Sequence, residues 1–579
     1  MNSKTPKFDE AIGKILDDLR PHTRQCRECQ NNFDIVAEDI EFYKKFKVPA
    51  PTLCPQCRMQ RRLAHRVILP IFYKKTCSAP GHQEKIISFY SEKNPIKIYD
   101  DKYYISDQWE ASNYQKKYQD NQNFFQQFHN FKLSIPHQAS SRDLNSINCD
   151  YTVSGNNSKD CYYSATTIDS EHVNFSVITV NSKFCYDVAD VDNSENCYDS
   201  IYLNNCYQVK YSRESSHCLN SAFLFDCRDC SDCFMSSNLR HKKYYFYNQQ
   251  LSKETYLKKI KQINLGNRIV VKKLKKDYQN MLLKKAIHKN VNNEKINNSV
   301  GNLLREVNNC YWAVRVFGGS ENLRYVSNGH GLKDVMDVFG AIKVSRCYES
   351  TGIGVDNDNL KFSIMIRGGS NLEYCTDCVN CSDCFACVGL KDKKFHIFNR
   401  KYQEEEYWQE IDRIKTSMLS KGEYGEFFPI KKSIHPYQDS VASTEYSLDE
   451  RVVKEKGWHQ AEEVESDLDL SKIKIINGEN IPADISQVDK SIFQKAIICS
   501  QTAKPFKITS FEFDFYKKHN IPLPTIHPLE RIKTRDKQKY NFTLYQDYCF
   551  RCKRKIISAH NPDRKLKVYC EKCYNEEVA

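Results

Sequence analysis

The sequence predicts a mainly β fold with helices, in which a duplicated, cysteine-rich β-solenoid with capping helices is flanked by a small cysteine-ligand module at each end. Two observations predict this fold. Four cysteines in paired CxxC spacing lie near each terminus, and short cysteine-led units recur twice in the middle. At 579 residues the chain is too long for one hydrophobic core, so a modular organisation is expected.

The N-terminal region is expected to hold an amphipathic helix at 1–22 and a metal module at 23–70. The module carries two CxxC pairs, Cys26 with Cys29 and, further along, Cys54 with Cys57. Each pair can act as a two-thiolate claw, and four thiolates complete the tetrahedral shell that zinc prefers. The sequence therefore predicts a structural Zn²⁺ site here.

The C-terminal segment 541–579 is predicted to be a zinc ribbon. It carries two CxxC pairs at a spacing typical of that module: Cys549, Cys552, Cys570 and Cys573. The chain is therefore expected to hold two structural zinc ions, one at each end.

The two ends are also related to each other. A constant shift places Cys26–Arg58 on Cys499–Arg531, with matching Phe-Tyr-Lys-Lys and Pro-x-Pro-Thr segments. The ligand positions of this second copy are occupied by Cys499, Thr502, His527 and Glu530, so 496–540 is interpreted as a degenerate module. By the same comparison 71–140 is a degenerate ribbon, in which Cys77 aligns with Cys549, followed by a helical connection.

The stretch from Cys26 to Arg62 resembles a family of treble-clef zinc-binding domains. The matching residues are Cys26, Cys29, Phe33, Glu41, Phe42, Tyr43, Cys54, Pro55, Cys57 and Arg58. As a whole, the chain resembles uncharacterised zinc-ribbon proteins from reduced-genome candidate bacterial phyla. These resemblances imply an organisation but no activity.

In a treble clef the second CxxC opens a helix, and here that helix is basic, with no acidic residue before Lys75. A basic helix held by zinc can lie against phosphates; the alternative is that its charge serves solubility. The candidate phosphate-binding residues are Arg58, Arg61, Arg62 and Arg66.

The two solenoids are predicted at 141–250 and 301–400. In the first, units recur at steps of 12 or 9, led by Cys149, Cys161, Val173, Cys185, Cys197, Cys206, Cys218 and then Cys227 or Cys230. In the second, the leading residues are Cys310, Leu323, Val335, Cys347, Leu360, Leu372 and Cys381. A fixed period of short β-rich units predicts stacked strands with the leading residue inside. Since Val and Leu replace Cys there, the cysteines are expected to be small buried residues.

Denser cysteine clusters close each run, at 227–233 and 375–387. Thiolates three residues apart could bind zinc or an iron–sulfur cluster. A column of buried thiols explains the clusters without metal and is the favoured interpretation.

Charged helices follow both runs: a basic helical linker at 251–300 with a break near Gly266, and a capping helix at 401–422. Residues 251–300 hold 13 Lys and Arg against three acids, which accounts for most of the net charge of +13. Such a block attracts polyanions or is simply solvated. Its candidate nucleic-acid-binding residues are Lys272, Lys273, Lys275 and Lys276. An acidic mixed linker is expected at 423–495.

The chain starts without a signal-peptide core and has no apolar stretch of about 18 residues, so a cytoplasmic protein without membrane contact is expected. A reducing compartment makes disulfides unfavourable for its 26 cysteines.

The expected function is non-enzymatic zinc-dependent nucleic-acid binding, with RNA favoured, through basic zinc-module helices and with the solenoid as a rigid spacer. The alternative is a protein–protein scaffold that uses the solenoid surface, and a polysaccharide-acting β-helix enzyme is the third hypothesis. No phosphate-binding loop, nucleophile elbow or HExxH motif is present, and no small-molecule substrate is indicated.

Overall fold

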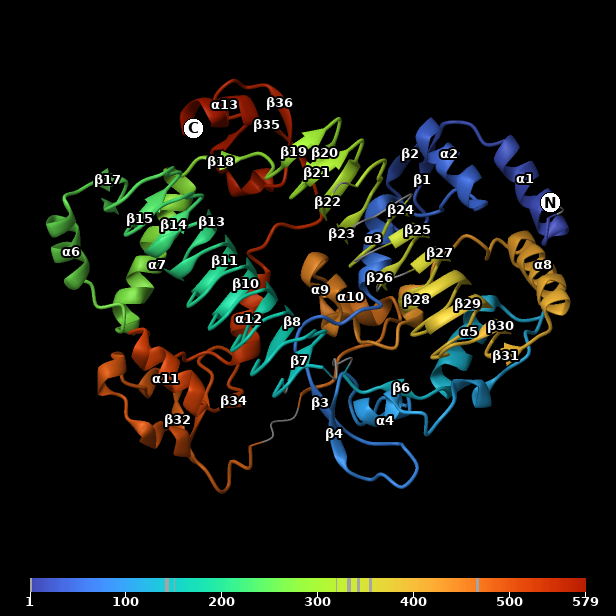
Figure 1. Cartoon of the computed structure of the whole chain (residues 1–579), viewed down its shortest axis with the longest axis horizontal. Coiled ribbons are helices and arrows are strands. Elements are labelled where there is room, and N and C mark those ends of the chain that lie inside the picture. Colours follow the sequence, from blue (N-terminus) through green and yellow to red (C-terminus); the bar gives the residue numbers. More distant parts are fainter. Residues whose placement is uncertain are drawn as a thin grey trace.

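The computed structural model describes residues 3–140, 145–149, 151–318, 320–330, 335–340, 344–353, 357–464 and 468–578. The fold is mixed, and its two large sheets are almost entirely parallel (Figure 1). Helices of the described chain are α1 (Pro6–Asp17), α2 (Ala37–Phe46), α3 (Pro55–Leu63), α4 (Asp101–Ile105), α5 (Phe124–Ser134), α6 (Lys253–Lys261), α7 (Arg268–Lys284), α8 (Glu404–Ser420), α9 (Val441–Glu445), α10 (Glu450–Glu455), α11 (Ser510–Lys518), α12 (Pro528–Asp536) and α13 (Glu571–Val578). None of these described helices combines the length and the apolar character that a membrane crossing requires.

The first large sheet follows the chain in order, strand beside strand. Its strands are β7 (Thr152–Val153), β8 (Ser164–Ile168), β9 (Val177–Val180), β10 (Tyr186–Asp192), β11 (Tyr198–Asn204), β12 (Tyr207–Lys210), β13 (Arg213–Ser216), β14 (Leu219–Phe225), β15 (Phe234–Ser237), β16 (Tyr245–Phe246) and β17 (Gln249–Gln250). All pairs are parallel except β16 with β17, which form an antiparallel end. Parallel partners keep one constant offset, as in Tyr186 opposite Tyr198 and Ala222 opposite Phe234.

This uniform offset of twelve corrects the predicted steps of nine. Cys197 lies in register with Val209, and not with Cys206, which lies in turn at the level of Cys218. The backbone explains the error, because between Asn148 and Tyr247 every third residue has a positive φ. The unit is therefore a triplet, and four triplets make one level. A level is one turn of four triplets, and each triplet contributes one inward position. Two cysteines nine residues apart therefore occupy different inward positions, while every level still contains twelve residues.

Up to Leu239, the residue after each positive-φ position points inside and is small or aliphatic. Cys161, Ser164, Thr167 and Ser170 occupy four consecutive inward positions, and all are buried. Serines form ladders between levels: the Ser170 hydroxyl accepts the N–H of Ser182, 12 residues on, at 3.2 Å. These ladders satisfy polar groups that burial would otherwise leave unpaired.

The second large sheet has the same parallel order with less regular spacing and consists of two parts. A five-stranded part ends before Val335, and an eight-stranded part begins there; in the described chain a single parallel bridge between Arg324 and Met336 joins them. Its strands are β19 (Glu294–Asn297), β20 (Val300–Asn302), β21 (Arg305–Asn308), β22 (Tyr311–Phe317), β23 (Ser327–His330), β24 (Val335–Met336), β25 (Val344–Tyr348), β26 (Thr351–Ile353), β27 (Asn357–Lys361), β28 (Ile364–Glu373), β29 (Val379–Phe385), β30 (Lys394–Ile397) and β31 (Arg400–Lys401). The offset is shorter by one where Glu294 faces Arg305 and longer by one where Val344 faces Asn357. Leu372 faces Cys384, so the predicted leading position Cys381 was again one triplet early.

Small hairpins and helices surround the two sheets. The hairpins are β1 (His22–Gln25) with β2 (Asn32–Ile35), β3 (Tyr73–Thr76) with β4 (Lys85–Ser88), and β35 (Tyr545–Tyr548) with β36 (Lys555–Ser558). Short parallel pairs join β5 (Ile98–Tyr99) to β6 (His137–Gln138) and β18 (His288–Lys289) to β37 (Val568–Tyr569). The segment predicted as an acidic mixed linker contains α9, α10 and β32 (Lys474–Asn477), which pairs with β33 (Lys495–Ile498) and thereby with β34 (Pro505–Phe506).

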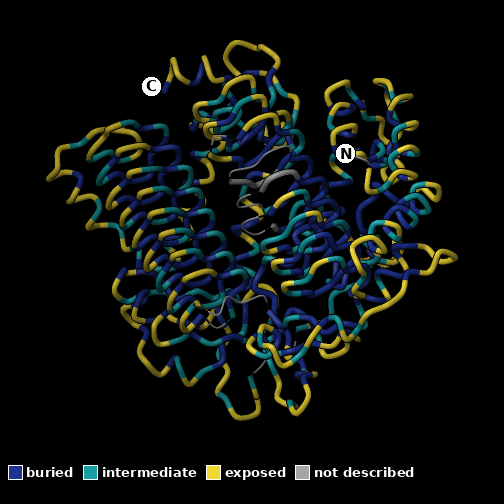
Figure 2. The backbone as a smooth tube through the Cα atoms, turned by 45° about the vertical axis from the view of Figure 1, so that its right-hand side comes forward, coloured by how far each residue is buried: buried dark blue, intermediate teal, exposed yellow. Residues whose placement is uncertain are grey.

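The modules exchange sheets: the N-terminal module packs on the second sheet, and the degenerate module near the C-terminus packs on the first. Helix α3 of the N-terminal module lies against the second sheet, whereas α12 near the C-terminus contacts β10 of the first (Figure 1). Figure 2 shows that the tube through both sheets is mostly buried or intermediate, while exposed residues follow the outer turns and helices. Gly266, between α6 and α7, lies so close to Asn520 that a Cβ there would clash with the oxygen of that side chain.

Candidate metal centres and charged surfaces

The N-terminal cysteines converge as the sequence predicts. Their four sulfur atoms all lie within 4.8 Å of one another, and the group consists of Cys26, Cys29, Cys54 and Cys57. The first pair follows β1, while Cys54 precedes α3 and donates its N–H to the Cys26 sulfur at 3.3 Å. A hydrogen bond from the Cys57 thiol is the largest of the effects that lower the pKa of Cys54 to about 5. The group could hold a metal ion, and four thiolates fit zinc.

The C-terminal cysteines form an equivalent group. Cys549, Cys552, Cys570 and Cys573 also place their sulfur atoms within 4.8 Å of one another. Burial raises the pKa of Cys549, but the backbone N–H groups of Cys552 and Cys570 outweigh it and bring this pKa down to about 6. The thiolate is the form that binds metal, so this group too is suited to zinc.

One backbone arrangement recurs at four places in the chain. The sulfur of a leading cysteine accepts the N–H of a residue directly before a helix, at 3.3–3.4 Å, in Cys26 with Cys54, Cys77 with Asp100, Cys499 with His527 and Cys549 with Cys570. The residue four positions after each cysteine has a positive φ, and these residues are Gln30, Gly81, Ala503 and Lys553. The N–H of the residue after each cysteine donates to a backbone carbonyl, at 2.7–3.1 Å. That carbonyl lies two positions before the residue that directly precedes the helix. These shared contacts support the duplication inferred from sequence.

The degenerate module at 496–540 has lost the metal geometry. His527 uses its Nδ1 to accept the N–H of Leu529, which caps α12. Within the described chain, Cys499, His527 and Glu530 do not form a group of convergent metal donors.

The interior cysteines are buried thiols, as predicted. All those of the two sheets are buried. The Cys381 thiol lies 3.3 Å from the Val379 carbonyl oxygen and 3.4 Å from that of Leu390, which are acceptors for its S–H group. Neither cluster, at 227–233 or at 375–387, forms a convergent metal group in the part of the chain that is described.

A phosphate-binding helix would have to present its arginines to solvent. The arginines of α3 do not face solvent. Arg58, Arg61 and Arg62 are all buried, and Arg62 is 0% exposed. Their guanidinium groups bind carboxylates that belong to the turns of the second sheet and, for Glu426, to the segment after α8. The pairs are Arg58 with Asp337 (2.6 Å), Arg61 with Glu349 (2.7 Å) and Glu426 (2.7 Å), and Arg62 with Asp337 (3.1 Å).

Arg66 lies beyond the end of α3 and is partly exposed, although its Nη1 atom is buried. Its guanidinium packs 5.6 Å from the centre of the Phe339 ring, and burial lowers its pKa to about 10. All four arginines assigned to phosphate contact therefore belong to the packing between α3 and the second sheet.

The degenerate module uses the same kind of contact. Arg535 binds the Asp187 carboxylate at 2.6 Å, and Arg531 binds Asp187 and Glu512. The shift that aligns the two modules places Arg531 on Arg58 and Arg535 on Arg62, and all four are buried. The arginines are thus the duplicated element by which each module holds a parallel sheet.

The lysines of α7 are exposed, in contrast. The helix buries Val271, Leu274, Tyr278 and Met281, and the Tyr278 hydroxyl donates to the Leu224 carbonyl at 2.6 Å. Lys275 binds Asp199 of the first sheet. Lys272, Lys273 and Lys276 form no ion pair with any described residue.

A second basic surface lies on the C-terminal module, and the sequence analysis missed it. Tyr548 is 64% exposed and Phe550 48%. Phe550 stacks on Tyr569 with ring centres 6.2 Å apart, and the Lys553 ammonium lies 5.0 Å from the centre of the Phe550 ring. Exposed cations follow Tyr548 and Phe550 in the chain: Arg551, which pairs with Glu576, and Lys553, Arg554 and Lys555. The alternation of aromatic and basic residues at 548–555 was the available signal.

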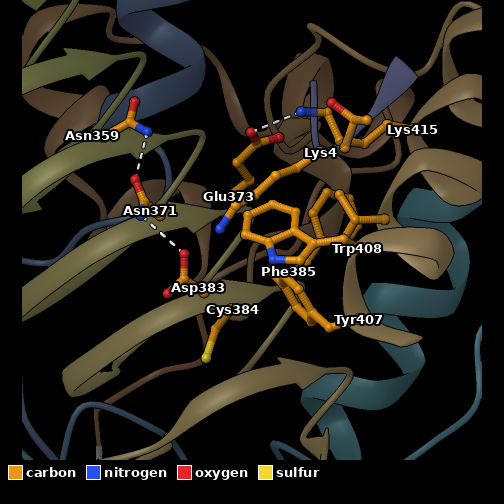
Figure 3. Close-up of a pocket in the computed structure, with 12 residues that line it drawn as sticks. Lys4, Asn359, Asn371, Glu373, Asp383, Cys384, Phe385, Tyr407, Trp408 and Lys415 are labelled. Atoms are coloured by element: carbon orange, nitrogen blue, oxygen red, sulfur yellow. Dashed lines mark hydrogen bonds and ion pairs between the residues drawn. The ribbon is translucent and has the colours of Figure 1, made fainter. Parts of the chain in front are cut away.

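A polar cavity of about 320 Å³ lies between α8 and strands β27 to β29 (Figure 3). On one wall the Asn359 amide donates to Asn371 at 2.8 Å, and Asn371 donates to Asp383 at 2.9 Å. On the other wall Lys415 binds Glu373 at 3.0 Å, and that lysine with Lys361 overcomes the effect of burial to hold the pKa of Glu373 at about 2. The charges offset one another, and the cavity presents no nucleophile with an adjacent base among its described lining residues.

In comparisons with known proteins, no family model, no curated protein and no solved structure matches this chain.

Proposed function

We propose that the protein binds single-stranded nucleic acid, with RNA favoured, through exposed α7 and the C-terminal metal module, and that both four-cysteine groups hold structural zinc. We call these two regions the α7–ribbon surface, defined by Lys272, Lys273, Lys276, Tyr548, Phe550, Lys553, Arg554 and Lys555. The observation that carries the proposal is the combination of exposed cations on α7 with exposed cations and aromatic rings on the C-terminal module, which is joined through β37 to β18, the strand that follows α7.

Helix α7 supports the proposal by presenting charge outward from a fixed support. Its apolar residues and Tyr278 pack on β14 and β15, so the helix is anchored along its length. Lys272, Lys273 and Lys276 lie on the opposite side, without carboxylate partners among the described residues. Unpaired cations on a rigid helix attract phosphates and release counterions when they bind them.

The C-terminal module supplies the stacking component. Single-stranded nucleic acids bind to aromatic faces flanked by cations, because every base has a π face and every nucleotide a phosphate. Tyr548 and Phe550 have exposed rings, and Lys553, Arg554 and Lys555 follow on the same knuckle. In a duplex the bases would not be available for such stacking, so a single strand is favoured.

The two regions are linked through a short strand pair. The chain leaves α7 at Lys284 and forms β18, which pairs with β37 of the C-terminal module, with His288 opposite Val568. Tyr574 of α13 also donates to Asp226 of the first sheet. One strand of nucleic acid could therefore contact both regions.

Zinc has a structural role in this proposal. A metal bound by Cys549, Cys552, Cys570 and Cys573 would fix the loop that carries Phe550 and Lys553. The N-terminal group would fix α3 in the same way, in a module of the treble-clef type. The stacked levels of the two sheets are interpreted as two β-solenoids that hold the modules at set positions.

The proposal is tested by the affinity of a labelled single-stranded oligonucleotide for the full-length zinc-loaded protein over a range of salt concentrations. Reversal of three charges, in Lys272→Glu/Lys273→Glu/Lys276→Glu, should weaken binding and reduce the slope of log K against log salt by about 2, at ~0.7 per phosphate contact. Tyr548→Ala/Phe550→Ala should weaken it by about 1–3 kcal/mol per lost stacked base, with the slope unchanged.

The matched control is Lys93→Glu/Lys116→Glu/Lys117→Glu, which makes the same charge change on exposed lysines outside the α7–ribbon surface. An equal loss of affinity in this control would show that only net charge matters. Absence of binding at low salt would reject the proposal, and tighter binding of single-stranded DNA than of RNA would revise the favoured ligand.

A protein partner is the second candidate, supported by one observation. Ile269 on α7 is 70% exposed, and Leu257 on α6 and Leu283 on α7 are also exposed. Capture of one defined protein that resists nuclease and is lost in Ile269→Glu would favour this alternative.

A further inference from the structure

The degenerate N-terminal knuckle at 73–103 keeps the backbone of a metal site. Cys77 follows β3, its sulfur accepts the N–H of Asp100 at 3.4 Å, and Asp100 caps α4. Both four-cysteine knuckles show the same contact at 3.3 Å. The position equivalent to Cys552 is Pro80, which cannot bind metal, so the second ligand of the ancestral pair is gone.

The loop of this knuckle is longer by two positions than in the other three. The N–H of Cys77 donates to the carbonyl of Glu84, seven positions on, whereas Cys26, Cys499 and Cys549 each donate to a carbonyl five positions on. The longer loop carries His82 and Glu84. Both direct a donor atom toward the cysteine, so that Cys77 Sγ, one His82 nitrogen and one Glu84 carboxylate oxygen all lie within 4.8 Å of one another.

We propose that Cys77, His82 and Glu84 form a third metal site, which takes a divalent ion of the zinc class. The longer loop supplies new donors in place of the lost CxxC ligand. A thiolate, an imidazole and a carboxylate are all common zinc ligands. Three protein donors leave a fourth tetrahedral position for water, which distinguishes this site from the two closed four-cysteine groups.

The surroundings of the site leave it accessible to solvent on one side. Cys77 is buried, while the His82 and Glu84 side chains are 36% and 51% exposed. His82 Nδ1 and Glu84 Oε1 are 2.7 Å apart, and the Tyr103 ring packs edge-on against the imidazole with centres 5.2 Å apart. Tyr103 stands where Cys573 stands in the C-terminal knuckle, so an aromatic ring orients the imidazole in place of the fourth ligand.

A simple ion pair between His82 and Glu84 is the competing explanation, and metal counting separates the two. The full-length protein, loaded with zinc and dialysed, should contain three equivalents of zinc per chain by mass spectrometry of the metal. His82→Ala/Glu84→Gln should contain two, and Cys77→Ser should contain two if it folds. The double variant changes only solvent-accessible side chains, so it keeps the test valid if Cys77→Ser fails to fold.

The matched control is His241→Ala/Asp229→Asn, because these form another exposed pair, 3.6 Å apart, outside any convergent metal group of the described chain. It should keep three equivalents. After replacement by cobalt, loss of the third site should remove absorption typical of one thiolate ligand and leave the stronger bands of the four-cysteine sites. Two equivalents in the unchanged protein, or a third that persists in His82→Ala/Glu84→Gln, would overturn the proposal. Neither result depends on nucleic-acid binding.

Discussion

At the residue scale, charge alone does not reveal which side of a helix faces the protein. Helix α3 is basic in sequence, yet its arginines are buried against Asp337, Glu349 and Glu426. These carboxylates lie at least 275 residues away in the chain. No local pattern could pair them with α3, because the pairing depends on how the module docks on the second sheet.

The duplication makes a quantitative prediction for these contacts. Asp337 is shared by Arg58 and Arg62, and Asp187 by Arg531 and Arg535. Removing the Asp337 charge leaves two buried guanidinium groups without their carboxylate, so Asp337→Asn should destabilise the protein by about 3–5 kcal/mol. After Asp187→Asn, Arg531 keeps Glu512 and Arg535 keeps Asp199, so the loss of stability should be smaller. Denaturant unfolding measures the change in the free energy of unfolding. The control is Asp120→Asn, which removes an exposed carboxylate and should change stability little. A near-neutral effect of Asp337→Asn would contradict the buried pairing.

Buried histidines make stability depend on pH. Burial is the largest influence on four of them and lowers the pKa of His65 and His560 to about 3, and of His137 and His288 to about 4. Between pH 6.5 and 4 the unfolded chain binds protons that the folded protein does not, so stability is present above pH 6.5 and is lost as pH falls.

Lowering the pH from 7 to 5 should reduce the free energy of unfolding by about 2 kcal/mol for each such histidine. His137→Gln should flatten the profile by that amount, while the exposed His241→Gln should leave it unchanged. Denaturant midpoints across this range provide the measurement, with zinc content followed at each pH to separate loss of metal. A profile in His137→Gln that is as steep as in the unchanged protein would contradict the assignment.

At the element scale, the sequence predicted the kind of repeat but not its unit. Cysteine recurs at regular spacing in an otherwise variable sequence, so the sequence reveals the repeats that begin with it. These cysteines are buried in the structure. Many inward positions are Ser and Thr, such as Ser158, Ser170 and Ser182, and these look polar in sequence. The triplet is defined by positive backbone φ. Asn and Asp, which tolerate this conformation, recur at these positions, but other residues such as Tyr163 and Phe175 interrupt them, so the composition marks the triplet only in part.

The thiol columns should tolerate replacement without loss of metal. Cys378→Val/Cys381→Val keeps two inward positions small and apolar, as Val173 and Val209 are in the first sheet. Zinc per chain should be unchanged, because these thiols face backbone carbonyls and not a metal group. Metal analysis of the variant tests this, with Cys552→Ser as the comparison that should lose one equivalent. Loss of iron or zinc on the double replacement would contradict the account.

At the scale of the whole molecule, the ends were the most predictable part. The CxxC spacings fixed both four-cysteine groups, because two short ligand pairs leave little freedom. The crosswise docking, with the N-terminal module on the second sheet and the degenerate C-terminal module on the first, was not predictable. It depends on contacts such as Arg535 with Asp187, between segments 348 residues apart.

This arrangement also bears on the proposed binding of nucleic acid. The arginines of both module helices hold the sheets, whereas basic residues of α7 and of the C-terminal knuckle are exposed. The proposal therefore keeps the ligand and the α7 lysines predicted from sequence, and replaces the arginines of α3 with the C-terminal knuckle.

Photo-crosslinking of the full-length zinc-loaded protein to a single-stranded RNA that carries a photoreactive base tests this claim most directly. Mass spectrometry of the crosslinked peptides should identify residues in 545–555 around Tyr548 and Phe550, together with peptides of α7 (Arg268–Lys284). Crosslinks confined to other surfaces, or crosslinks to the buried helix α3 (Pro55–Leu63) in the folded protein, would contradict it.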